Sequence, residues 1–314
     1  MTWDEVRAAA RSFGFEAIAA AGAAPVPMPQ GVIHPQAMAL IADPHDILPE
    51  ARSVLLLAMP YRPFRSNPPD AEIDAYYMTS NRAHESARLF ADWLCERGVK
   101  AVMTSSLRVK PLAARAGLGR QGRSTLIAVG AYGTRVSLQT IVTDMPCARA
   151  DDDERGLDAR CLNCRACMDA CPTHALRGDG TLDIERCVRA QPENQPLPEE
   201  MRPLTHASLL GCDICQRVCP RNAEVEPIDI PQDVKEALSL RRLISGDYKP
   251  LIPILGRNNA RKLRVLNRAA LAAANRDRRD LLPLLEMLTE LPEPVGAHAR
   301  WAIDRLTEEN GRRT

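Results

Sequence analysis

The sequence predicts an α+β protein in three parts: a mixed α/β first half, a cysteine-rich middle segment and a wholly helical end. Three observations predict this order. The continuous apolar run ARSVLLLAMPY at residues 51–61 is typical of a strand buried on both faces. Eight of the ten cysteines lie between residues 161 and 219. From about residue 233 the apolar residues recur with the period of α-helices.

Composition bounds the class of protein. With 314 residues and 45% hydrophobic content the chain can bury a large core, and its 41 basic and 40 acidic residues leave a net charge of +1. We therefore expect no bulk attraction to nucleic acid or to an anionic membrane. No run of 18 apolar residues occurs and the first residues alternate charged and apolar types, so we expect a cytoplasmic protein without a membrane segment. In that reducing compartment, clustered cysteines favour metal binding over disulfides.

The elements of the first half follow from periodicity and from glycine and proline. Residues 1–22 read as one amphipathic helix, ended by the proline-rich GAAPVPMPQGVIHP. After the strand at 51–61, a helix is predicted at 85–98 with Gly98 as its C-cap, followed by a strand at 99–105. A further helix covers 109–119, and STLIAVGAYGTRVSLQTIVTD reads as two strands joined at the Tyr132-Gly133 turn.

Composition shifts also mark the boundaries between the parts. The acidic ADDDERGLD at residues 150–158 reads as the linker into the cysteine-rich segment, and VEPIDIPQD as the linker out of it. We predict domains at 1–150, 151–232 and 233–314. In the last, LRVLNRAALAAANR and GAHARWAIDRL resemble each other at an offset of about 31 residues, which suggests degenerate helical hairpins of the HEAT type.

The spacing of the cysteines is specific for iron-sulfur clusters. CLNCRACMDACPTHA, residues 161–175, has the x2, x2, x3 spacing and trailing proline of 4Fe-4S sites, in which the fourth cysteine commonly reaches a second cluster. CDICQRVCP at 212–220 supplies three more cysteines, and Cys187 completes eight. We expect crossed ligation, with Cys161, Cys164, Cys167 and Cys219 on one cluster and Cys171, Cys187, Cys212 and Cys215 on the other.

A zinc ribbon is the alternative for these cysteines, because CxxC pairs also bind zinc. The three-cysteine run with its trailing CP favours iron-sulfur clusters. Cys95 and Cys147 are left over and read as buried or incidental thiols. Clusters alone only move electrons, so the first half must receive them, yet its GLGRQG at 117–122 does not match a nucleotide-binding GxGxxG.

At this point the chain resembles a known family, the epoxyqueuosine reductases, which are cobalamin-dependent enzymes of tRNA modification related in their core to corrinoid reductive dehalogenases. DPHDILPEARSVLLLAMPY looks like the family's first strand segment, and LAARAGLGRQGRSTL is similar to its AGLGWxGKNTL stretch. IVTD, CLNCRACMDACPTHA, LDIERC and LPEEMRPLTHASLLGCDICQRVCPRN follow the family closely. HARWAIDRL is similar to its HEAT-like C-terminal domain, while Asp213 and Gln216 match its CDDCQ in part and could tune the potential of a cluster.

The resemblance implies a reductive-dehalogenase-like α/β domain that binds base-off cobalamin, a ferredoxin-like double-cluster domain and an electron donor such as ferredoxin or flavodoxin. Electrons passed through the clusters would generate Co(I), which reduces epoxyqueuosine in tRNA to queuosine. The cobalamin region would include Gly117, Gly119, Gly122, Arg123 and Thr125. Arg120 and Arg123 could instead grip a phosphate or carboxylate, or lie in solvent.

Several residues depart from the family pattern. A gapless alignment places Met103 or Thr104 where the family carries its proposed proton-donating aspartate, and the family's DYH becomes Arg82-Ala-His84. The glycine-rich GEMxY segment is shortened or absent around residues 27–40. These changes suggest a paralogue with altered chemistry.

No catalytic residue follows from the sequence, but three side chains could deliver a proton: His84, Tyr76 and Tyr77. Each could equally serve structure, with His84 on a helix surface and the tyrosines in the core. Two other functions compete with the reductase of tRNA: an electron-transfer or corrinoid-activating protein that has lost the substrate chemistry, and a reductase of a small molecule.

A basic stretch gives the only hint of a tRNA contact. Eight basic residues against two acidic ones lie between residues 257 and 280, a local net charge of +6 that would suit an RNA backbone: Arg257, Arg261, Lys262, Arg264, Arg268, Arg276, Arg278 and Arg279. A solvated helical face is the alternative, and the scarcity of aromatic residues gives no support for base stacking.

Overall fold

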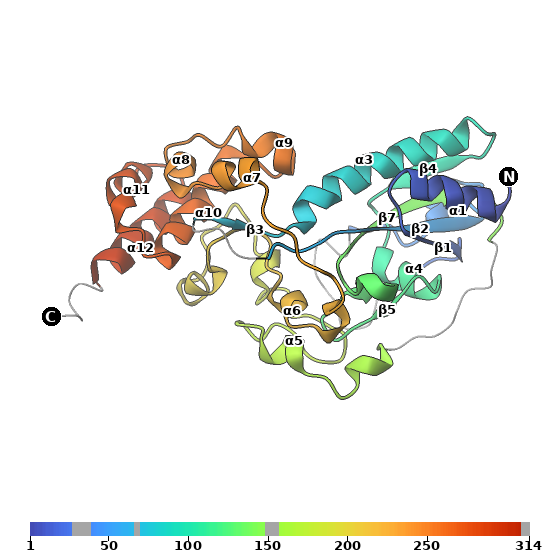
Figure 1. Ribbon diagram of the computed structural model, residues 1–314, viewed down its shortest axis with the longest axis horizontal. Helices are drawn as coiled ribbons and strands as arrows, with labels where there is room; N and C mark the ends of the chain where they lie inside the picture. The colour runs from blue at the N-terminus through green and yellow to red at the C-terminus, as the bar shows by residue number, and fades with distance from the viewer. Residues whose placement is uncertain (27–38, 66–69, 148–156, 309–314) are drawn as a thin grey trace.

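The computed structural model describes residues 1–26, 39–65, 70–147 and 157–308 (Figure 1). A sheet with its helices lies at one end of the molecule, the helices of the C-terminal part lie at the other, and the cysteine-rich segment lies between them (Figure 1). The family's GEMxY segment would fall mostly on residues 27–38, outside the described residues.

A four-stranded sheet in the order β1-β2-β7-β4 organises the first half: β1 Ala17–Gly22, β2 Ser53–Pro60, β7 Val136–Thr143 and β4 Ala101–Thr104. Leu56 of β2 packs in one core and Leu57 in another, so the prediction of a strand buried on both faces is confirmed. All neighbours pair antiparallel, unlike the parallel strands typical of an α/β domain.

Helices cover both faces of this sheet. On one side lie α1, Trp3–Ser12, and the long α3, Tyr76–Cys95, whose residues share a core with β2. On the other lies α4, Val109–Arg115. Each predicted helix and strand from residue 85 to 119 is present.

One prediction for the first half was wrong. Residues 1–22 do not form one helix, because Gly14 takes a φ of +89° and ends the turn, after which the alanine-rich β1 pairs with β2. An alanine run has little strand propensity, so the pairing partner decides. The two strands predicted on either side of the Tyr132-Gly133 turn are present as β6, Ile127–Ala128, and β7, and each has another partner: β6 pairs with β5, Arg120–Gln121, and β7 joins the main sheet.

The cysteine-rich segment has little regular structure. It contains two single-turn helices, α5 Ala166–Asp169 and α6 Ile214–Arg217, and the short β8, Ser208–Leu210. The strand β8 pairs in parallel with β3, Glu72–Ile73, from the first half of the chain.

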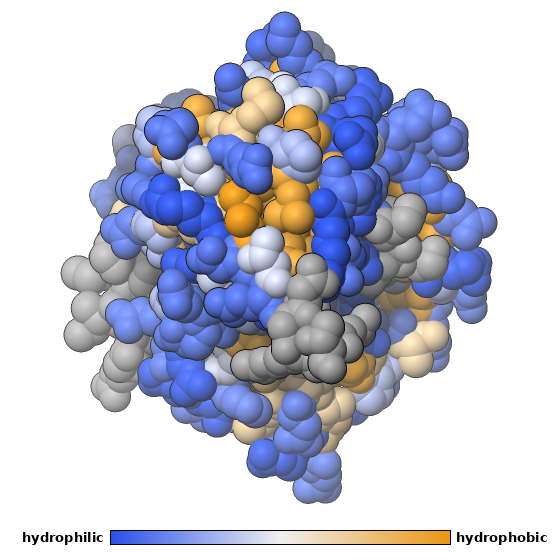
Figure 2. Space-filling view, turned by 90° about the vertical axis from the view of Figure 1, so that its left-hand side faces the viewer, coloured by the Kyte–Doolittle hydropathy of each residue, from blue (hydrophilic) through white to orange (hydrophobic). Residues whose placement is uncertain are grey.

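The C-terminal part is helical, as predicted: α7 Gln232–Ala237, α8 Leu240–Ile244, α9 Leu251–Leu255, α10 Lys262–Asn275, α11 Leu282–Leu288 and α12 Val295–Glu308. Its core also contains Ala71 and Ile73 from the first half. Figure 2 shows this end as mainly hydrophilic with an apolar area at its centre. Among the described residues, no helix is both long and apolar enough to cross a bilayer.

Buried polar groups join α10 to α12. The fully buried His298 accepts a hydrogen bond from Leu197 N at 2.9 Å through Nε2 and bonds Asn267 through Nδ1. Asn267 and His298 occupy matching places in the two similar sequences, 31 residues apart. The bond therefore fastens α10, α12 and the cysteine-rich segment together.

Candidate redox centre and adjoining cavities

The eight clustered cysteines gather in two groups. Burial raises the pKa of Cys167, and the nearby thiols of Cys219, Cys161 and Cys164 raise it further. Burial likewise raises the pKa of Cys215 to about 12, and its neighbouring thiols are Cys212, Cys167, Cys187 and Cys171. Cys167 thus belongs to one group and also lies within electrostatic reach of the other.

The two groups differ in what surrounds them. Cys171, Cys187, Cys212 and Cys215 all line a cavity of about 430 Å³, here called the cysteine cavity. Around the other group, Leu162 and Val218 are exposed large apolar side chains. Within the described parts of the chain, no three Cys, His, Asp or Glu side chains converge closely enough to hold one metal ion.

A second cavity, of about 340 Å³, adjoins the first. This distal cavity shares Tyr76, Val109 and Leu138 with the cysteine cavity. Its walls come from α3, the end of β4 and the centre of β7, and include His84 and Thr104. The two cavities therefore adjoin at these three residues, with one cysteine group lining the first cavity and His84 lining the second.

The three candidate proton donors lie in different places. Tyr76 lines both cavities and His84 the distal one. Tyr77 instead packs against the helical core and closely approaches Gly211. The guanidinium of Arg189 lies 4.7 Å from the centre of the Tyr76 ring and 5.5 Å from that of Tyr77.

At the position of the family's aspartate, the strand alternation decides which residue faces the cavity. Thr104 lines the distal cavity, whereas Met103 packs with the core below the sheet. Thr104 Oγ1 accepts a hydrogen bond from Ser106 N at 3.0 Å. Of the two residues expected at the position of the family's aspartate, the one that lines the cavity is therefore Thr104, which carries a hydroxyl.

The glycine-rich loop at 117–125 packs between the cavity and the cysteines. A Cβ on Gly119 would lie 2.3 Å from Ala128 O, and one on Gly122 would lie 3.3 Å from Cys161 Sγ. Gly117 takes a φ of +66° after α4. The guanidinium of Arg123 hydrogen-bonds to backbone within the fold, since it donates to Leu162 O at 2.8 Å and to Cys164 O at 3.3 Å.

Two residues of this loop, Ser124 and Thr125, line the cysteine cavity, and Thr125 is the one expected in the cobalamin region. The Oγ1 atom of Thr125 accepts from Lys110 Nζ at 3.2 Å. Burial, and to a smaller extent the charge of Arg189, lower the pKa of Lys110 to about 8. Lys110 is a functional candidate that the sequence analysis missed, since a lysine near the start of a helix carries no signal of its own.

A buried polar network joins the cysteine segment to the sheet, and it too was missed. Arg135, 2% exposed, donates from Nη1 to Asp213 Oδ2 at 2.9 Å. Gln216 Oε1 accepts from Tyr61 OH at 3.1 Å and from Thr134 Oγ1 at 3.2 Å. Asp213 and Gln216 each follow a cysteine of the cavity group, so the network positions that loop.

The basic stretch is largely engaged within the fold. Arg264 pairs with Glu193, Arg276 with Glu72, Arg278 with Asp70 and Asp280, and Arg279 with Asp277. Burial lowers the pKa of Arg268. The three exposed members are Arg257, Arg261 and Lys262. They flank Asn258, which lines the distal cavity.

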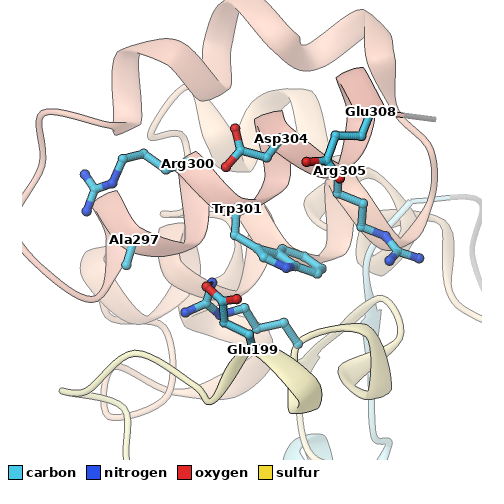
Figure 3. Close-up of a pocket in the computed structure, with 8 residues that line it drawn as sticks. Glu199, Ala297, Arg300, Trp301, Asp304, Arg305 and Glu308 are labelled. Atoms are coloured by element: carbon cyan, nitrogen blue, oxygen red, sulfur yellow. Dashed lines mark hydrogen bonds and ion pairs between the residues drawn. The ribbon is translucent and has the colours of Figure 1, made fainter. Parts of the chain in front are cut away.

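A third hollow lies on the C-terminal helices (Figure 3). Trp301 stands in it between Glu199 on one side and Asp304, Arg305 and Glu308 on the other (Figure 3). Three arginines and three carboxylates line it in all, so their formal charges cancel. No cysteine lines it, and charge gives it no preference for an anionic partner.

Comparison with known proteins agrees with this geometry. Residues 160–222 match the family model of the 4Fe-4S double cluster binding domain, so the chain carries two 4Fe-4S clusters. The epoxyqueuosine reductase of Lactococcus garvieae is 31% identical over 220 residues, which cover 67% of this chain and 61% of that protein. The Bacillus cereus enzyme is 27% identical over 84% of this chain and 75% of its own length. The chain is thus similar to epoxyqueuosine reductases over most of its length.

Solved structures show how far the family's fold extends over the chain. The Bacillus subtilis epoxyqueuosine reductase superimposes with a TM-score of 0.81 at 24% identity, covering 96% of this chain and 90% of that one. A catabolic reductive dehalogenase shares the fold more distantly, with a TM-score of 0.50 at 16% identity over 83% of this chain and 37% of that one. The epoxyqueuosine reductase fold therefore includes the helical C-terminal part.

Proposed function

We propose that the chain is a cobalamin-dependent reductase that passes electrons through two 4Fe-4S clusters to reduce epoxyqueuosine in tRNA to queuosine. The observation that carries the proposal is that two cavities adjoin and share lining residues. One cavity is lined by four cysteines and the other by His84, with Tyr76 shared between them. A reductase needs this order of electron source, cofactor space and proton donor.

The cluster ligands of the proposal are the two sets expected from spacing, Cys161, Cys164, Cys167 and Cys219, and Cys171, Cys187, Cys212 and Cys215. Support comes from the thiols that influence Cys167 and Cys215 and from the four cysteines of the second set around one cavity. The proximity of Cys167 to Cys215 supports transfer from the first cluster to the second.

The cysteine cavity suits a corrinoid in one testable respect. Lys110 has three N–H donors, and Thr125 Oγ1 is its acceptor among the described residues. A ligand rich in amide and phosphate oxygens would accept the remaining donors. Cobalamin, when bound, would supply the two-electron reducing power that single clusters lack. Gly119 and Gly122 keep the neighbouring loop close to the protein and so leave this space open.

We assign delivery of the proton to His84 in this proposal. The Bacillus subtilis enzyme has a catalytic loop carrying an aspartate, whereas Thr104 faces the cavity here. An imidazole can donate a proton near neutral pH, and His84 lines the same cavity. Tyr76, held beneath Arg189, would position the substrate between the two cavities.

The tRNA would lie across the mouth of the distal cavity. An epoxyqueuosine reductase has been solved with an epoxyqueuosine-modified tRNA-Tyr stem loop. In this chain Arg257, Arg261 and Lys262 are exposed beside Asn258 of that cavity, and clustered cations bind phosphates. The proposal also includes HEAT-like pairing of α10 with α12, a ferredoxin or flavodoxin donor, and a cytoplasmic setting.

The test is turnover of epoxyqueuosine-containing tRNA by the anaerobically reconstituted protein, followed by mass spectrometry of the nucleosides. We expect about eight irons per chain, a corrinoid spectrum that changes on adding protein, and loss of one oxygen from the nucleoside. His84→Asn should abolish most turnover while iron content and corrinoid binding persist. Tyr77→Phe, outside the cavities, is the matched control. Bound and reducible cobalamin without turnover would refute the substrate and leave an electron-transfer or small-molecule function.

A further inference from the structure

The first cysteine group borders an exposed apolar surface. Leu162, directly after Cys161, is 58% exposed, and Val218, directly before Cys219, is 41% exposed. Arg221, two residues after Cys219, pairs at 3.4 Å with Asp158, three residues before Cys161, so the two apolar side chains belong to one region. Figure 1 shows α5 and α6 side by side at the edge of the molecule away from the sheet and from α12. Large exposed apolar side chains beside a redox centre indicate a contact surface.

The charges on this surface are mainly positive. Arg160 is exposed, and Arg165 is 63% exposed, with Asp169 3.4 Å away as its partner. Such an exposed pair is weak and yields readily to a stronger partner. Asp158 and its partner Arg221 are 9% and 16% exposed, so neither of these charges faces outward. The outward-facing charges of this surface are therefore Arg160, Arg165 and Asp169, two positive and one negative.

The second cysteine group faces the other way, into the cysteine cavity. The pair of groups therefore has an outer end and an inner end, linked where Cys167 approaches Cys215. Electrons bound for the cavity must enter at the outer end, because transfer between centres falls steeply with distance.

We propose that Leu162 and Val218, with Arg160 and Arg165, form the docking surface for a small acidic electron-carrier protein. This surface, here called the entry patch, matches the composition of transient redox contacts, with an apolar centre, charged surroundings and a small area. In each encounter the carrier loses one electron and an oxidised cluster gains it, and no bond is made or broken. The proposal rests on the cluster sites proposed above but not on the substrate.

Charge complementarity selects the partner. An acidic carrier is steered toward Arg160 and Arg165, which raises its association rate at low salt. A neutral small reductant gains nothing from the patch. The two reductants therefore separate docking from the intrinsic reactivity of the clusters.

The experiment measures reduction of the clusters in the reconstituted protein by stopped-flow absorbance, with reduced flavodoxin and with photoreduced deazaflavin, a neutral small reductant. We expect Leu162→Glu and the double variant Arg160→Glu/Arg165→Glu each to lower the flavodoxin rate constant by about tenfold or more at low salt. The deazaflavin rate should stay within about twofold of wild type. Met287→Glu, at a 71% exposed apolar side chain on α11, is the matched control and should not change either rate.

Three results would overturn the proposal. They are a flavodoxin rate unchanged in both entry-patch variants, an equal fall with Met287→Glu, and an equal fall in both reductants' rates. Because the readout stops at the clusters, the experiment works whether or not the protein turns over epoxyqueuosine. Loss of turnover with normal flavodoxin reduction would count against the proposed substrate alone.

Discussion

Replacing Asp213 by asparagine should be among the most destabilising single changes outside the apolar core. Asp213 Oδ2 accepts from Arg135 at 2.9 Å, and the two side chains are 9% and 2% exposed. Asparagine keeps the shape but leaves the guanidinium buried without its counter-charge. Breaking one partner of a buried ion pair costs about 3–5 kcal/mol. Asp74 remains within electrostatic reach of Arg135, so we expect the lower end, about 3 kcal/mol.

Arg217→Gln supplies the matched comparison. Arg217 Nε donates to the other oxygen of Asp213 at 2.6 Å, but its side chain is 45% exposed. Solvent screens such a pair, so its loss should cost less than about 1 kcal/mol. Asp213→Asn takes the carboxylate from both arginines, whereas Arg217→Gln removes only the more exposed arginine, with its pairings to Asp213 and Glu72. The additional loss in Asp213→Asn therefore reports the buried pair with Arg135.

Urea unfolding of the anaerobic, reconstituted protein provides the assay, with cluster absorbance and tryptophan fluorescence as probes. At a slope near 3 kcal/mol/M, about 3 kcal/mol lowers the midpoint by roughly 1 M for Asp213→Asn, against a third of that or less for Arg217→Gln. Equal midpoints for the two variants would refute the argument from burial.

Three further predictions concern other parts of the molecule. Burial lowers the pKa of His298 to about 4, so its neutral form stabilises the fold fully above pH 6.5, and up to about 3 kcal/mol of the free energy of unfolding is lost as the pH falls from 6.5 to 4. In His298→Asn, the dependence of the urea midpoint on pH over that range should flatten. An unchanged slope would exclude His298 as the source of the pH dependence. Gly133→Ala should lower the thermal midpoint more than Gly130→Ala, because both have positive φ but only at Gly133 would the Cβ meet backbone, at 2.2 Å from Arg221 O; equal midpoints would contradict this. Changing Arg257, Arg261 and Lys262 together to glutamine should reduce the salt dependence of tRNA binding by up to about three counterions in a filter-binding assay, whereas Arg300→Gln in the charge-balanced hollow should not, and equal slopes would remove the stretch from the interface.

The sequence could predict those elements that a short stretch of residues determines by itself. The strand at 53–60 is apolar at every position after Ser53, and the cysteine spacings repeat a known cluster geometry, so both could be predicted from short stretches. The strand β1 could not, because its alanines become a strand only through pairing with β2. The Arg135–Asp213 pair joins residues 78 apart in sequence, and neither carries a signal until the fold brings them together.

The same reasoning applies to the candidate site. His84 was a candidate by residue type alone, and its value comes from sharing a cavity with Thr104 and Tyr76. The basic stretch has the charge expected of an RNA contact, but not all eight of its cations are available to bind phosphates. Folding pairs several of them with carboxylates distant in sequence, such as Glu193 and Glu72. Net charge in a sequence counts cations without showing which ones remain available to a ligand.

The pairing of β3 with β8 limits how this architecture can be divided. Residues 71–73 come from the first part of the chain, yet they complete the core of the helical end and hydrogen-bond to a strand beside the cysteines. A cut at residue 150 or 232 would leave the helical fragment with an apolar gap and an open strand edge. The helices are therefore not an appendage that recombination could exchange freely. Any relative with a different C-terminal part must also have changed a short stretch more than a hundred residues earlier in its chain.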